Sequence, residues 1–149
     1  MQIRVEEMQP QRDRVEALSQ TNARLLAYTR NDAEAGTSRV VTGQLTIAQH
    51  LVYALFDSGA SHSFASYGFA EKLSYIKNRI GQIFRTTLPS RKILLSEFRL
   101  EHVPIVIANR ELYTDLVVLK IIDYDVILGM DFLGKYQATI DCRNRKVIF

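Results

Sequence analysis

The chain has 149 residues, a length that fits one domain with an additional arm. Hydrophobic residues make up 47% of the sequence, enough for a packed core, and no apolar run approaches the length of a membrane-spanning helix. The first residues lack the apolar region of a signal peptide, and Cys142 is the only cysteine. We therefore expect an intracellular, cytoplasmic protein without a disulfide or a membrane partner, with Cys142 half-buried as a small side chain.

The net charge is only +3, but the basic residues are concentrated in one stretch. Residues 71–99 carry seven basic and two acidic side chains. Such an excess can attract nucleic acid or an acidic peptide. The basic residues are not interleaved with aromatic side chains that would stack on bases, so we interpret the stretch as a solvated face and do not expect nucleic-acid binding.

Composition divides the chain near residue 38. Residues 1–38 are rich in Arg, Glu, Gln and Ala, and apolar residues recur at roughly helical spacing around 11–28. We predict a linker or arm over 1–38 that is partly helical or disordered, with an extra helix packed on the domain as the alternative. The domain itself is predicted over 39–149.

From residue 39 the pattern is that of short strands. Apolar and polar residues alternate from Gly43 to Ile47, Gln49-His50 offers a turn, and Leu51–Phe56 is strand-prone. A short helix is expected near 65–73 and another from Asp131. Further strands are predicted at 82–87, 92–98, 103–108, 116–121, 125–129, 138–143 and 146–149. Many short strands at close spacing favour an all-β barrel or sandwich.

The most informative residue is Asp57, which ends an apolar strand and is followed by Ser58 and Gly59. Desolvation penalises a carboxylate at the edge of a core, so this placement needs a reason. A carboxylate that activates water must be held firmly and reached by solvent. Peptide hydrolysis needs both an acid and a base, which two facing carboxylates can supply by sharing one proton. With one Asp-Ser-Gly per chain, the second would come from the other copy of a two-fold dimer.

Two motifs carry a family resemblance that covers roughly residues 30–149. The run Leu55-Phe-Asp-Ser-Gly-Ala-Ser-His-Ser-Phe64 resembles the active-site motif of retropepsin-like aspartic proteases of plant gypsy-class long-terminal-repeat retrotransposons. The run Asp125-Val-Ile-Leu-Gly-Met-Asp-Phe-Leu133 resembles the second hallmark of that family, and Gly129 lies 70 positions after Gly59. The tripeptide alone is a weak signal, but the two motifs at this separation are specific.

The resemblance implies a small all-β, retropepsin-like barrel or sandwich with a flap hairpin and one short C-terminal helix, which functions as a homodimer. Asp57 would be catalytic together with its symmetry mate. Ser58, Gly59, Ala60 and Ser61 would support the active-site loop, while Ile127, Leu128 and Gly129 would pack beside it. No cofactor or metal is implied.

The resemblance also implies a flap, and the hairpin Gln82–Glu97 is the candidate. Its tip is predicted at Leu88, Pro89, Ser90 and Arg91, where Pro occupies a favoured turn position. Flaps of this family are usually rich in glycine, and no glycine lies between Gln82 and Gly129.

Other chemistries fit the residues less well. His62 lies between Ser61 and Ser63, but a nucleophile elbow requires Gly-x-Ser-x-Gly, which is not present. The three histidines form no spaced pair, so a metal site is not expected. For Asp57 itself, the alternative is a carboxylate that caps a turn. Asp131 is predicted to cap the terminal helix or pair with an arginine, and Asp123 and Asp125 to flank a strand.

The resemblance predicts an aspartic endopeptidase that processes its own Gag-Pol polyprotein in the cytoplasm or in virus-like particles. Its partners would be a second copy and a polypeptide substrate. The alternative is a non-catalytic module that keeps the fold for dimerisation or peptide binding.

Overall fold

The computed structural model describes residues 6–8, 20–24, 40–73, 77–141 and 143–149, with side chains described from residue 40 on. Cys142 and most of the predicted arm lie outside the described residues. No helix among the described residues is long and apolar enough to cross a membrane. The domain boundary near residue 38 stays a prediction.

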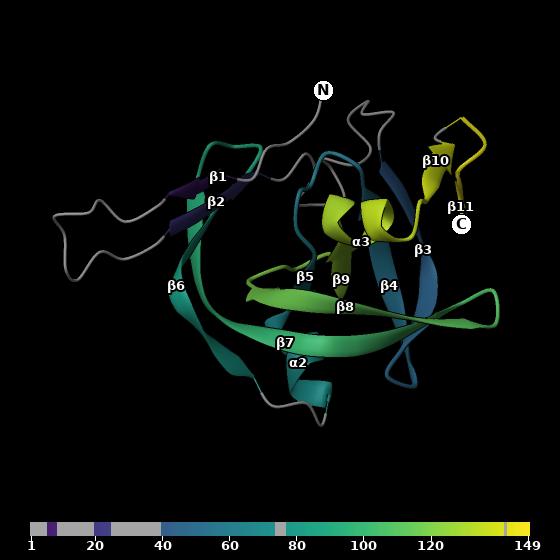
Figure 1. The fold of residues 1–149 in the computed structure, drawn as a ribbon, viewed down its shortest axis with the longest axis horizontal. Helices are drawn as coiled ribbons and strands as arrows, with labels where there is room; N and C mark the ends of the chain where they lie inside the picture. The colour runs from purple at the N-terminus through teal and green to yellow at the C-terminus, as the bar shows by residue number, and fades with distance from the viewer. Residues whose placement is uncertain (1–5, 9–19, 25–39, 74–76, 142) are drawn as a thin grey trace, which may run out of the picture.

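The described residues form a predominantly β structure with two short helices (Figure 1). Nine strands make one sheet in the order β1-β2-β6-β7-β3-β4-β9-β5-β8, and a further pairing of β7 with β8 closes part of it into a barrel. The C-terminal hairpin β10–β11 is a separate two-stranded sheet. The elements are β1 (Glu6–Met8), β2 (Gln20–Arg24), β3 (Val40–Ile47), β4 (His50–Asp57), β5 (Phe64–Ser66), α2 (Tyr67–Lys72), β6 (Asn78–Thr87), β7 (Ile93–Ile107), β8 (Arg110–Leu119), β9 (Val126–Leu128), α3 (Met130–Lys135), β10 (Thr139–Asp141) and β11 (Lys146–Ile148). The predicted small all-β fold is confirmed.

The hairpin β3–β4 delivers Asp57 to the end of a buried strand. Its turn lies at Ala48 and Gln49, one residue earlier than predicted, and both have positive φ angles, 48° and 69°. Two-residue hairpin loops favour this conformation because its twist matches that of the flanking strands. His50 consequently belongs to β4 and pairs with Ile47.

The hairpin β6–β7 projects from the barrel, as predicted, and turns at Leu88–Arg91. The amide of Arg91 donates to the carbonyl of Leu88 over 2.8 Å, and Arg91 has a φ of 71°. This left-handed residue takes the place that glycine usually fills in a three-residue hairpin loop. The strand predicted at 103–108 is not separate, because β7 runs on from the hairpin into the barrel and pairs with β8.

One prediction about the N-terminal segment is wrong where the structure describes it. Residues 20–24 are not helical but form β2, which pairs in parallel with residues 83–87 of β6 (Figure 1). The rest of the span 11–28 lies outside the described residues. An unpaired edge of β6 offers backbone hydrogen bonds that outweigh the weak helical spacing of this segment.

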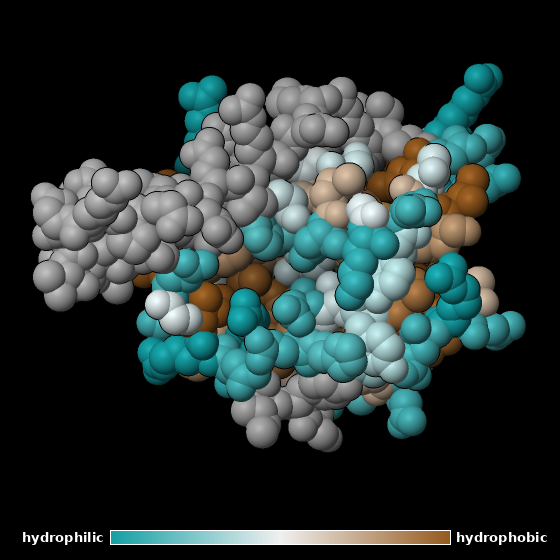
Figure 2. Space-filling model, in the orientation of Figure 1, coloured by the Kyte–Doolittle hydropathy of each residue, from teal (hydrophilic) through white to brown (hydrophobic). Residues whose placement is uncertain are grey.

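The core has two parts. One lies between the barrel strands and helices α2 and α3 and includes Leu100, Leu116 and Phe132. The other lies beneath the hairpin β6–β7 and includes Leu55 and Phe84. On the face seen in Figure 2, hydrophilic side chains follow β7, whereas hydrophobic ones reach the surface over the hairpin β10–β11. The second part of the core is the one that borders the Asp57 loop.

The segment after β9 packs backbone to backbone against the loop after β4. A Cβ atom on Gly129 would lie 2.3 Å from the carbonyl oxygen of His62 and 2.6 Å from that of Ala60. Because Gly129 has an ordinary extended backbone, with φ −104° and ψ −166°, the requirement for glycine is one of space and not of conformation.

We predict that Gly129→Ala lowers the free energy of unfolding by at least about 2 kcal/mol, because neither carbonyl can move without shifting the loop. Chemical denaturation would measure this. Gly43→Ala is the matched control, since a Cβ at Gly43 meets nothing within 4 Å. Equal stabilities of the two variants would contradict the close approach.

Candidate active site

Asp57 is the last residue of β4, and its side chain is completely buried. One carboxylate oxygen, Oδ1, accepts a hydrogen bond of 2.8 Å from the amide of Gly59. The carbonyl of Asp57 accepts another of 3.0 Å from the amide of Ala60. The tight turn over residues 57–60 therefore fixes the carboxylate from its own loop.

The second motif lies directly beside this loop, as predicted. β9 pairs in parallel with β4, with Ile127 opposite Leu55 and Leu128 opposite Phe56, so Gly129 follows this ladder at the level of Asp57. The carbonyl of Ala60 accepts a hydrogen bond of 2.6 Å from the amide of Met130. The carbonyl of Ser61 accepts one of 3.2 Å from the amide of Asp131.

Ser63 and Asp131 form a second tie between the two motifs, one that the sequence analysis missed. The Ser63 hydroxyl donates to Oδ1 of Asp131 over 2.6 Å and accepts from the amide of Gly129 over 3.0 Å. The amide of Ser63 donates to Oδ2 of Asp131 over 3.2 Å. The two residues are 68 positions apart, and only the paired motifs could have suggested that they meet.

Burial raises the pKa of the Asp131 carboxyl, and the hydrogen bonds from Ser63 and from the amide of Phe132 oppose that increase. Asp131 lies inside α3 and accepts from the amide of Phe132 over 2.8 Å, whereas the N-cap is Gly129, so Asp131 stabilises the first turn but is not its cap as predicted. Asp131 is thus a structural anchor of the loop. Asp125 instead anchors strand β4, because its Oδ2 accepts from the amide of Tyr53 over 2.8 Å.

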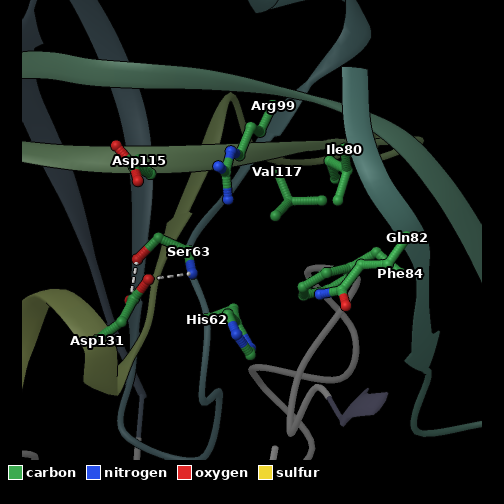
Figure 3. A pocket seen from close by; sticks show the side chains of 9 residues that line it. All are labelled: His62, Ser63, Ile80, Gln82, Phe84, Arg99, Asp115, Val117 and Asp131. Carbon is green, nitrogen blue, oxygen red and sulfur yellow. Dashed lines mark hydrogen bonds between the residues drawn. The ribbon is translucent and has the colours of Figure 1, made fainter. Parts of the chain in front are cut away.

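Beside the loop lies a cavity of about 150 Å³, between residues 62–63 and the hairpin β6–β7 (Figure 3). His62 meets Phe84 of β6 edge to face, with ring centroids 4.8 Å apart. Burial lowers the pKa of His62 to about 4. His62 is therefore a neutral wall of the cavity near neutral pH. The cavity is lined by His62, Ser63, Ile80, Gln82, Phe84, Arg99, Asp115, Val117 and Asp131.

The predicted tip of the hairpin is divided between core and solvent. Leu88 is buried in the same cluster as Ala60 and Ile127, whereas Pro89, Ser90 and Arg91 are exposed. The hairpin thus reaches the apolar surroundings of the Asp57 loop. Among the residues from 40 on that the structure describes, no group of three or more His, Asp or Glu side chains is arranged to hold a metal ion.

One solved domain shows the same fold. The retroviral protease-like domain of Ddi1 from Leishmania major superposes with a TM-score of 0.58 at 23% sequence identity, covering 76% of this chain and 87% of that one. EIAV protease complexed with the inhibitor HBY-793 has a TM-score of 0.49 at 23% identity, covering 67% of this chain and 90% of that one.

A family model matches most of the chain, although no curated protein sequence matches it. The family model described as "Retroviral aspartyl protease" matches residues 19–149, which include β2, both motifs and the hairpin between them. The chain belongs to the retroviral aspartyl protease family.

Proposed function

We propose that this chain is an aspartic endopeptidase whose active site forms only when two copies associate. The observation that carries the proposal is the environment of Asp57, a carboxylate at the end of a buried strand. Its Oδ1 is held by the Gly59 amide in a loop tied by backbone to a second motif. A family whose members are aspartyl proteases makes hydrolysis of a peptide bond the natural use of this arrangement.

The proposed chemistry needs two carboxylates that share one proton. The ionised carboxylate takes a proton from a water molecule, which attacks the scissile carbonyl, and the protonated carboxylate donates a hydrogen bond to the carbonyl oxygen. The chain has one such carboxylate in one such loop, so Asp57 of a second copy supplies the other. Ser58 would orient the neighbouring loop, and Gly59 would contact the substrate backbone.

Exposed apolar side chains near the second motif support a homodimer. Ile122, in the loop before β9, is 77% exposed, and Met130, directly after Gly129, is 40% exposed. Burial of such side chains against a second copy would be favourable. Met130 directly follows Gly129 and so lies beside the Asp57 loop, whereas Ile122 precedes β9 at the other end of that strand.

The hairpin β6–β7 is proposed as the flap. Its tip residue Leu88 packs in the cluster that contains Ala60 of the Asp57 loop. A hairpin in this position can open to admit a peptide and close to exclude water during hydrolysis. Pro89 and the absence of glycine at the tip make it stiffer than a glycine-rich flap.

For the biological role, we propose that the enzyme cuts the Gag-Pol polyprotein of a gypsy-class retrotransposon into its parts, in the cytoplasm or within virus-like particles. The resemblance of its two motifs to that class supports this assignment.

The second candidate is a non-catalytic module that dimerises or binds peptides. The complete burial of Asp57 and the glycine-free tip of the hairpin favour it, because hydrolysis needs a carboxylate that water can reach. The two candidates differ in one observable, which is specific proteolysis that depends on Asp57.

We predict that Asp57→Asn lowers kcat/KM by about 100-fold or more while the dimer persists, because an amide cannot take the proton from water. Cleavage of a peptide library by the purified chain, read by mass spectrometry, would identify substrates for this measurement. Asp141→Asn, which alters an exposed carboxylate of the C-terminal hairpin, is the control. Undiminished cleavage by Asp57→Asn would refute the assignment.

We predict that acid destabilises the folded chain through His62. Burial lowers the pKa of His62 from 6.5 to about 4, so between these values the unfolded chain binds a proton that the folded chain does not. The contribution to stability is present above pH 6.5 and is lost as the pH falls towards 4. Acid favours proteolysis by a carboxylate pair. The loss of folding stability would therefore set the lower pH limit of activity.

Thermal melts of wild type and His62→Phe across this range would test the prediction. The variant keeps an aromatic ring against Phe84 and should show a flatter dependence of Tm on pH. His50→Gln, at an exposed histidine, should keep the slope of the wild type. The same slope in His62→Phe as in the wild type would contradict the prediction.

A further inference from the structure

The hairpin β6–β7 has two hydroxyl groups on the face that carries Phe84. Thr86 lies two residues after Phe84 on β6, and side chains at such spacing share a face of a strand. Ser96 lies directly opposite Phe84 on β7, and Leu94 lies opposite Thr86. In an antiparallel pair, opposed residues also share a face, so both hydroxyls lie on this one.

This face is turned towards the Asp57 loop. The ring of Phe84 contacts His62 at 4.8 Å and Phe64 at 6.0 Å between centroids. Leu94 packs against the cluster that includes Phe84 and Ala60. Thr86 and Ser96 are flanked by these residues. Both hydroxyls therefore lie on the side of the proposed flap that faces the Asp57 loop.

Both hydroxyls are buried without a hydrogen-bond partner. Thr86 is 0% exposed and Ser96 is 1% exposed, and among the described residues neither oxygen has a partner. A buried hydroxyl without a partner is unfavourable, and a Val or Ala in its place would avoid the penalty. Two such groups at diagonal positions on one face call for an explanation in terms of what the hairpin contacts.

We propose that Thr86 and Ser96 bind the main chain of the peptide substrate. The inference rests on the proposed function, because it assigns these hydroxyls to the peptide that lies between hairpin and loop. An extended peptide presents alternating N–H and C=O groups, and a hydroxyl can donate to one or accept from the other. Main-chain contacts would serve every substrate sequence, which suits an enzyme that cuts several different junctions.

Thr86→Val and Ser96→Ala test the proposal, because each removes a hydroxyl with little change in shape. We expect KM to rise about 2- to 10-fold in each variant with kcat nearly unchanged, as for the loss of one hydrogen bond made equally in ground and transition states. The increase should be similar for several peptides of unrelated sequence. The dissociation constant of labelled pepstatin, a statine-containing peptide, should rise by a similar factor and requires no turnover.

Thermal stability separates binding from structure. Removal of an unpartnered buried hydroxyl should leave Tm unchanged or higher, whereas a hydroxyl with a structural role would lower it. Thr87→Val, on the opposite face of β6, is the matched control and should change neither KM nor Tm appreciably.

Each outcome bears on the proposal. A KM and a pepstatin affinity that stay at wild-type values in Thr86→Val and Ser96→Ala would overturn it. An increase limited to peptides with one particular side chain would overturn the assignment to the main chain. A wild-type chain that neither cuts peptides nor binds pepstatin would refute the proposed function and this inference with it, whereas an active wild type with unaffected variants refutes the inference alone.

Discussion

The close backbone contact between the loop after β4 and the segment after β9 holds the candidate site together. The amides of Met130 and Asp131 donate to carbonyls of that loop, and Gly129 approaches so closely that no Cβ fits. Contacts made by backbone are insensitive to side-chain rotamers and so are well suited to fixing a position. The parallel pairing of β4 with β9 aligns the two segments, and Ser63 and Asp131 add a side-chain bond to the same junction. These contacts therefore hold the loop that carries Asp57 in a fixed position.

The proposed hydrolysis would need a second carboxylate that this loop of a single chain does not supply. A single buried carboxylate can serve as a base or an acid but not as both at once. The fold has a projecting hairpin and apolar surface near the second motif. In the proposed dimer the hairpin would act as the flap, and the apolar surface would be buried against the second copy. Two responses to pH would oppose each other: the proposed carboxylate pair would work with one proton bound, whereas burial keeps His62 neutral and makes acid destabilising. The proposed enzyme would work between these limits.

Much of the fold could be predicted because the strands of the domain carry alternating side chains and the two motifs mark the junction. Ile127, Leu128 and Gly129 lie beside the Asp57 loop as expected, since their resemblance to a family motif encodes that contact. The bond between Ser63 and Asp131 could not be derived from local pattern, because it joins positions far apart in the chain. The helix expected around 11–28 failed at residues 20–24, where pairing with an open strand edge decides the conformation. The unpartnered hydroxyls could not be predicted either. Alternating polar and apolar residues indicate which face of a strand is buried, but not what that face contacts.

The central claim is that each copy contributes half of one catalytic site, and mixing tests it most directly. Wild type and Asp57→Asn would be refolded together at a fixed total concentration and varied ratio, and cleavage of one peptide measured. If mixed dimers carry a single carboxylate and are inactive, activity will fall as the square of the wild-type fraction. A linear fall with the wild-type fraction would mean that each chain works alone, and would contradict the account.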